Sequence, residues 1–128
     1  MTRHRLEDGA AAVEFALVVP LLLLVLFAIV DLGWIFNQQL AVTAAAREGA
    51  RYYAVNYDEA GAKAAAEARA ANLVSGPVTI TYASVCTGGQ DEDLTMVVKT
   101  PMTDLTGWVV TISGGASLTG KGTMRCNG

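Results

Sequence analysis

The stretch Gly9-Ala-Ala-Ala-Val-Glu14-Phe15 opens a run of apolar residues that continues without a break to Val30. A membrane-spanning helix needs roughly 20 mainly apolar residues, and residues 10–30 supply about that number. One carboxylate, Glu14, lies just inside this run, although an ionised glutamate in hydrocarbon costs roughly a few kcal/mol even on lenient insertion scales. The stretch therefore predicts a membrane helix in which Glu14 has a specific use.

The charged residues predict how this helix is oriented. Arg3 and Arg5 precede the apolar run, and the next basic residue is Arg47. By the positive-inside rule, the N-terminus lies in the cytoplasm and the rest of the chain lies outside.

The 128 residues leave room for one small domain beside the helix. With a formal net charge of −3 and no basic stripe, the chain is not expected to bind nucleic acid.

The chemistry-bearing residues are few. Outside the cytoplasm Cys86 and Cys126 are expected to form a disulfide, with two buried thiols as the alternative. The single histidine is His4, so a zinc site of Cys and His ligands cannot be assembled. The acidic run 91–93 could attract a cation, but such a run is usually a solvated turn. We therefore expect no metal, no cofactor and no enzymatic activity.

Helical patterning continues well beyond the apolar run and predicts one helix over residues 10–55, with Pro20 inside it. After Asp31 the pattern is amphipathic, and small residues then permit another element to approach closely. The apolar face comprises Leu32, Ile35, Phe36 and Leu40, and the small residues are Ala41, Ala44, Ala45, Ala46, Gly49 and Ala50. Asn56 with Glu59 three residues later matches a capping box and predicts a second helix that ends near Leu73.

Three later segments alternate apolar and polar residues with a period of two, which is typical of half-buried strands. Their apolar positions are Val78, Ile80 and Tyr82, then Leu94, Met96 and Val98, then Ala116, Leu118 and Met124. The predicted fold is α+β: a small three-stranded antiparallel sheet packed on the two helices. The link between the second and third strands carries Leu105, Trp108, Val109 and Val110, and we expect a short helix or turn that plugs one end of the core.

Two details of the sheet stay open at this stage. Cys86 and Cys126 share the parity of the apolar face, yet a middle strand between theirs would separate them by roughly 9–10 Å, beyond disulfide reach. The bridge then requires both cysteines to lie past the end of the second strand, or another strand order. Gly120 and Gly122 fall on the inward side of the third strand, where they either admit a helix backbone or form a local bulge.

Several stretches of the sequence resemble a known protein family. Gly9-Ala-Ala-Ala-Val-Glu14-Phe15, the leucine-rich run, and Ala45-Ala-Arg-Glu-Gly-Ala-Arg51-Tyr resemble the TadE-like minor pilins (pseudopilins) of tight-adherence (Tad/Flp) pili. The end, Gly122-Thr-Met-Arg125-Cys126, is similar to actinobacterial members. In the commoner type IV pilins a prepilin peptidase cuts after the glycine, and phenylalanine usually follows the cleaved bond. Here Ala10 follows Gly9, so a general type IV peptidase is not the expected enzyme.

The resemblance implies a prepilin peptidase that cuts between Gly9 and Ala10, which makes Glu14 the fifth mature residue and Phe15 the sixth. It also implies that Glu14 meets a mature N-terminal amine in the filament; the alternative is a glutamate that snorkels to the headgroups. Implied partners are the peptidase, other pilin subunits, the Tad assembly machinery and the membrane. Surface adhesion and biofilm formation are the implied roles.

These expectations divide the chain into a leader (1–9), a long helix (10–55; 10–30 transmembrane and 31–55 extracytoplasmic) and a small extracytoplasmic α+β domain (56–128). The protein would occupy the cytoplasmic membrane as a single-pass subunit and reach the cell surface in a pilus. The alternative is an uncleaved bitopic membrane protein with a small extracytoplasmic partner-binding domain.

Overall fold

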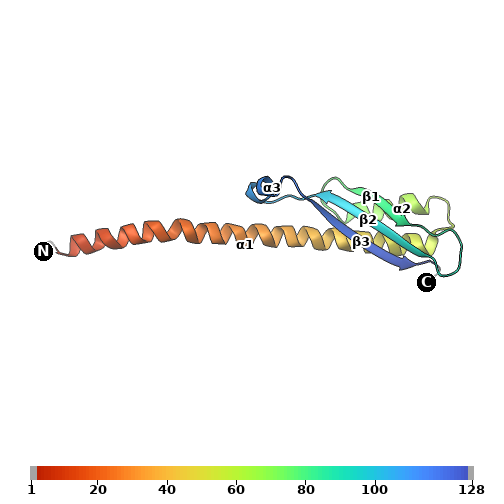
Figure 1. The fold of residues 1–128 in the computed structure, drawn as a ribbon, viewed down its shortest axis with the longest axis horizontal. Helices are drawn as coiled ribbons and strands as arrows, with labels where there is room; N and C mark the ends of the chain where they lie inside the picture. Colours follow the sequence, from red (N-terminus) through yellow and green to blue (C-terminus); the bar gives the residue numbers. More distant parts are fainter. Residues whose placement is uncertain (1–2, 127–128) are drawn as a thin grey trace.

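The fold is α+β, as predicted: one long helix carries a second helix and a three-stranded antiparallel sheet (Figure 1). A computed structural model describes residues 3–126, with side chains from residue 9. Residues 1–2 of the predicted leader and residues 127–128 of the predicted domain 56–128 lie outside the described residues. The elements are α1 (Arg3–Asn56), α2 (Ala62–Asn72), β1 (Thr79–Ser84), β2 (Asp93–Pro101), α3 (Trp108–Ile112) and β3 (Ser117–Arg125).

Helix α1 begins earlier than predicted, at Arg3 rather than near residue 10. The prefix contains no proline, and a glycine inside a helix costs only about 0.5–1 kcal/mol relative to alanine, so Gly9 does not end the helix. Pro20 also lies inside it. At 1.5 Å per residue the 54-residue helix is roughly 80 Å long, and its N-terminal half extends away from the rest of the chain (Figure 1).

The predicted capping box is wrong, because Asn56 ends α1 instead of starting α2. Its side-chain amide donates a hydrogen bond to the Tyr52 carbonyl at 2.8 Å, which satisfies an acceptor in the last turn of α1. The chain then reverses at Gly61, whose φ of 86° is available to glycine at little cost, and α2 starts at Ala62 with no side-chain cap.

The sheet has the order β1-β2-β3, with β2 in the middle. Both pairings are antiparallel, and Met96 of β2 lies opposite Tyr82 of β1 and Gly122 of β3. The inward side chains of β2, from Leu94, Met96 and Val98, are completely buried. The predicted strands and their inward parity are confirmed, except that Ala116 precedes β3 and is exposed.

The face of α1 that covers the sheet carries the small residues that were expected to permit close approach, and not the apolar side chains that precede them. Leu32, Phe36 and Leu40 are 51%, 67% and 71% exposed. The covering face instead consists of small residues one turn further on, and it belongs to the core cluster: Val42, Ala45, Ala46, Ala50 and Ala54. Small side chains prevail because the helix backbone lies almost directly on the strands.

Gly120 and Gly122 make that close approach possible. A Cβ at Gly120 would overlap the carbonyl of Val42, and a Cβ at Gly122 would overlap the carbonyl of Ala46. Of the two alternatives left open by the sequence, the structure shows the close helix approach. β3 pairs with β2 in continuous register through both glycines, so neither forms a bulge.

Helix α3 does not plug the core, contrary to the prediction. None of its residues is buried, and it lies beyond the end of the sheet, beside the middle of α1 (Figure 1). The inward side chains of β2 and the alanines of α1 and α2 already fill the core, so the apolar residues of the β2–β3 link have no place in it.

We predict that Gly122→Ala lowers the free energy of unfolding by about 1–3 kcal/mol, the usual cost of overpacking a core, because backbone atoms cannot yield to the new methyl group. Gly120→Ala should behave alike. The control is Gly33→Ala on α1, where a Cβ meets nothing within 4 Å. Urea unfolding in detergent, followed by near-ultraviolet circular dichroism, measures the difference; equal midpoints for all three variants would contradict the close-approach argument.

Candidate functional site

The largest exposed feature is the apolar half of α1. Of the helices in the described part of the chain, only α1, over Gly9–Asn56, is long and apolar enough to cross a membrane, and its most apolar stretch is not buried inside the protein. The following side chains of this half are each more than half exposed: Val13, Phe15, Leu17, Val18, Leu21, Leu22, Leu24, Phe27 and Ile29. A soluble protein does not leave so large an apolar surface in water, so this half of α1 is a candidate membrane span.

Gly9 and Ala10 lie inside α1, and both are exposed. A Cβ at Gly9 would meet nothing within 4 Å, and its φ is not in the left-handed region. The fold therefore gives no reason for glycine at this position. The folded half of the chain lies at the C-terminal end of α1 (Figure 1).

Glu14 and Phe15 project from the same exposed stretch. Phe15 is 70% exposed. Among the residues whose side chains are described, Glu14 has no hydrogen-bond or ion-pair partner. A carboxylate held in an apolar helical surface can accept hydrogen bonds from an amine, and in low dielectric such a pair is favoured over a lone charge. The geometry thus suits Glu14 to a partner outside this folded chain.

Asp31 is a functional candidate that the sequence did not reveal. It is fully buried, and its carboxylate accepts hydrogen bonds from the Leu105 amide, at 3.1 Å, and from the Thr106 hydroxyl. The Thr106 hydroxyl is the main reason that the pKa of Asp31 lies below its ordinary value of 3.8. In the sequence Asp31 is only the first charged residue after the apolar run. No local sequence pattern indicates its hydrogen-bond partner, which lies 74 residues away.

Cys86 and Cys126 form a disulfide with a Cα–Cα distance of 5.8 Å. Cys86 follows the end of β1 and Cys126 follows β3, and both lie past the start of β2 at Asp93. The bridge therefore forms with β2 in the middle of the sheet, because both cysteines lie past the end of that strand. This is the first of the two alternatives that the sequence left open. With a sequence separation of 40 between the cysteines, the chain-entropy model gives a stabilisation of roughly 3–4 kcal/mol.

The acidic loop 91–93 stabilises the end of the sheet. Asp91 pairs with Arg125 at 3.2 Å. Glu92 accepts hydrogen bonds from the hydroxyl and the amide of Thr87, which hold the pKa of Glu92 below its usual range. Within the described residues no three His, Cys, Asp or Glu side chains are grouped so that they could hold a metal ion.

Comparison with known proteins places the similarity on α1. A family model described as TadE-like protein matches residues 9–51. These residues include the apolar run, Glu14 and the small-residue face under the sheet, but not α2 or the strands. No curated protein and no solved structure matches the chain.

We predict that Asp31 and Thr106 couple by about 1.5–3 kcal/mol, the range for hydrogen bonds to charged groups. Asp31→Ala or Thr106→Val should speed amide hydrogen exchange in residues 104–113 and leave β2 unchanged. Because the folded pKa of Asp31 is lowered, its contribution is complete at neutral pH and is lost as the pH falls through that lowered value.

The control for this experiment is Asp91→Asn, which removes an exposed carboxylate with a single ion pair. It should not alter exchange in residues 104–113. Unchanged exchange in that segment for Asp31→Ala would show that the β2–β3 link does not depend on this carboxylate.

Proposed function

Since residues 9–51 match the model of the TadE-like family, we propose that the chain is a non-enzymatic minor pilin of a Tad type IV-like pilus. In this proposal a prepilin peptidase cuts between Gly9 and Ala10, and the mature subunit enters or primes the filament. The subunit is membrane-inserted before assembly and takes part in surface adhesion afterwards. Its partners are the peptidase, other pilin subunits and the Tad assembly machinery.

The observation that carries the proposal is the lack of a role within the fold for Gly9 and Glu14. Glycine weakens a helix and Glu14 weakens a membrane helix, yet neither residue touches the folded half of the chain. A peptidase that reads Gly9 and an assembly step that uses Glu14 would account for both costs. The cut needs only local opening of the first turns of α1, and helix ends open at little free-energy cost.

The chemistry of assembly follows from the cut. Cleavage would create an ammonium group on Ala10, four residues before Glu14 and thus about 6 Å away along a helix. A carboxylate on a neighbouring subunit could neutralise that amine once both are removed from water. The pair would recover much of the desolvation cost that each charge alone could not.

A second apolar surface supports a subunit that associates laterally. Phe36 and Leu40 lie beyond residues 10–30 and remain mostly exposed. They would face water in an isolated membrane-anchored domain. In a filament they could be buried against adjacent subunits, as exposed apolar patches commonly are at interfaces.

The disulfide supports the proposed orientation. The Cys86–Cys126 bridge belongs in an oxidising compartment, and Arg3 and Arg5 favour a cytoplasmic N-terminus. Both support an extracytoplasmic position for the sheet in this proposal.

One observation favours the alternative function, an uncleaved bitopic protein with a partner-binding extracytoplasmic domain. Helix α1 continues from Arg3 through Gly9 and Ala10 without interruption, as a permanent anchor would. The two functions differ in the first residue of the native protein, which is Ala10 for the pilin and an uncut N-terminus for the anchor.

We expect intact-mass analysis of the membrane-extracted protein to give a chain that begins at Ala10, and to show a two-proton mass increase on reduction. Gly9→Ala should abolish the cut. Because a Cβ at Gly9 meets nothing, the loss would reflect recognition and not misfolding. Gly33→Ala is the matched control on the same helix and should be cut normally; a native chain that keeps residues 1–9 would overturn the pilin proposal.

We expect Glu14→Gln, which keeps the shape and removes the charge, to leave cutting intact and to reduce the amount of this subunit in sheared pili. Glu14→Asp should retain part of the incorporation. Lys121→Gln on the exposed side of β3 serves as a charge control. Normal incorporation of Glu14→Gln would remove the assembly role of the carboxylate.

A further inference from the structure

The link between β2 and β3, residues 102–116, reaches back along α1 into the region of its apolar half (Figure 1). We call these residues the α3 loop. Asp31 holds its base against α1 through the Leu105 amide and the Thr106 hydroxyl. From there α3 lies beside α1, and Trp108 shares a cleft with Leu23, Leu24 and Phe27.

The position of this cleft along α1 gives the depth of the α3 loop. If residues 10–30 span the hydrocarbon, Phe27 lies about 4–5 Å inside its edge and Leu23 about 10 Å inside. The cleft extends further, to Pro20, near the middle of the span. A side chain that lines a cleft with these residues cannot stand in the water above the membrane.

The surface of the α3 loop matches that depth. Leu105, Trp108 and Ile112 are 58%, 43% and 75% exposed. Asp104 is the only charged residue in 102–116, and its carboxylate is engaged by the backbone amides of Val109 and Val110 at 2.8 and 3.1 Å. The loop therefore offers its surroundings an apolar face with no free charge.

The backbone of the α3 loop is also suited to a medium without water. Lipid tolerates irregular backbone only where its polar groups have partners. Besides the amides bound by Asp104 and Asp31, the amides of Thr111, Ser113, Gly114 and Gly115 donate to carbonyls within the loop. The hydroxyls of Thr111 and Ser113 likewise donate to loop carbonyls.

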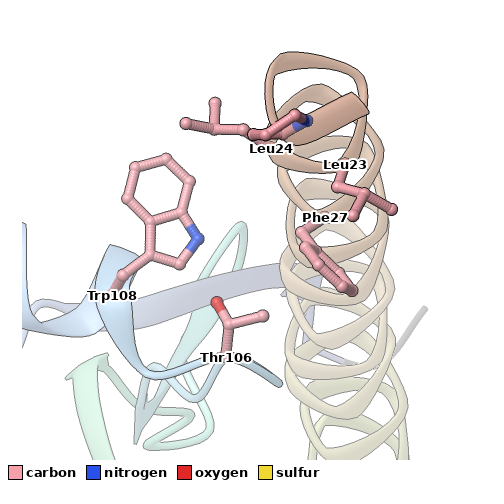
Figure 2. A pocket seen from close by; sticks show the side chains of 6 residues that line it. Leu23, Leu24, Phe27, Thr106 and Trp108 are labelled. Atoms are coloured by element: carbon pink, nitrogen blue, oxygen red, sulfur yellow. The ribbon is translucent and has the colours of Figure 1, made fainter. Parts of the chain in front are cut away.

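Two open apolar clefts separate the α3 loop from α1. The first, of about 420 Å³, is lined by Trp108 and Thr106 on one side and by Pro20, Leu23, Leu24 and Phe27 on the other. Figure 2 shows the indole of Trp108 on one side of this space and Phe27 of α1 on the other, with Leu24 above and Thr106 below. The second cleft, of about 280 Å³, lies between Ala28 and Leu32 on α1 and Trp108, Val109 and Ile112 on the loop.

We propose that the α3 loop inserts into the leaflet through which α1 leaves the membrane toward the folded half. Lipid acyl chains fill the two clefts, and the Trp108 indole lies near the edge of the hydrocarbon, where tryptophan is enriched in membrane proteins. Acyl chains are the expected occupant because the clefts continue the lipid-exposed surface of α1. The α3 loop is then a second membrane contact that fixes how the sheet is held over the bilayer, whether or not the leader is cut.

The test uses the full-length chain in phosphatidylcholine vesicles at high lipid-to-protein ratio. Trp34→Phe leaves Trp108 as the single tryptophan. Its emission should lie at short wavelength, lose intensity to lipids brominated along the acyl chain, and resist aqueous iodide. The matched reporter is Trp108→Phe, which leaves Trp34 on α1, about 6 Å beyond Val30 and beside polar residues such as Asn37 and Gln38. It should lose less to brominated lipid and more to iodide.

Trp108 emission that iodide quenches and brominated lipid does not would overturn the proposal. Protection of Trp108 from both quenchers that grows as the protein-to-lipid ratio rises would assign the clefts to a second copy of the chain, and would also overturn it. Both readings are independent of leader cleavage, so they are distinguishable from a failure of the pilin proposal.

A second variant tests the insertion of α3 itself. Ile112→Asp, combined with Trp34→Phe, places a charge on the most exposed apolar side chain of the α3 loop, where no packing in the fold depends on it. Quenching of Trp108 by brominated lipid should fall, whereas Ile112→Leu should preserve it. Non-reducing intact mass verifies that the disulfide is retained; quenching unchanged in Ile112→Asp would contradict insertion of this face.

Discussion

The two halves of α1 have different surroundings, since one half exposes large apolar side chains and the other half packs against a sheet. Every other element is arranged around that constraint. The N-terminal half of α1 presents large apolar side chains outward, where only hydrocarbon can cover them. The C-terminal half presents alanine and glycine to a sheet, where close backbone packing replaces side-chain interdigitation. Because a helix is one rigid hydrogen-bonded rod, the depth of the first half in a membrane determines where the sheet and the α3 loop stand above it.

Close packing on the second half depends on missing side chains on both partners. Gly120 and Gly122 remove the Cβ atoms of β3 at the two places where α1 crosses it. The Met96 and Val98 side chains opposite them on β2 supply the apolar volume of the core. A core built largely from alanine buries little area per residue, so the Cys86–Cys126 bridge makes an important contribution by restricting the unfolded chain.

Asp31 lies at the junction between the two halves of α1 and connects them to the α3 loop. A buried carboxylate with satisfied hydrogen bonds is costly to disturb, because removal of a partner leaves an uncompensated charge. The α3 loop is thereby held beside the apolar half of α1 and not over the sheet. Gly9 and Glu14, by contrast, contribute no hydrogen bond or ion pair to the described folded half, and the proposed cleavage and assembly steps would give both residues a use.

The sequence by itself determined the features that follow from periodicity and from single residue types. A long apolar run predicts the exposed helix, period-two alternation predicts the three strands, and shared parity puts Cys86 and Cys126 on the inward face. Only the tertiary structure decided that Leu32, Phe36 and Leu40 stay exposed, that Asn56 ends one helix and does not start another, and that Trp108 lies beside α1 and not in the core. These outcomes depend on competition for the same buried space and on a hydrogen bond across 74 residues, and neither leaves a local pattern in the chain.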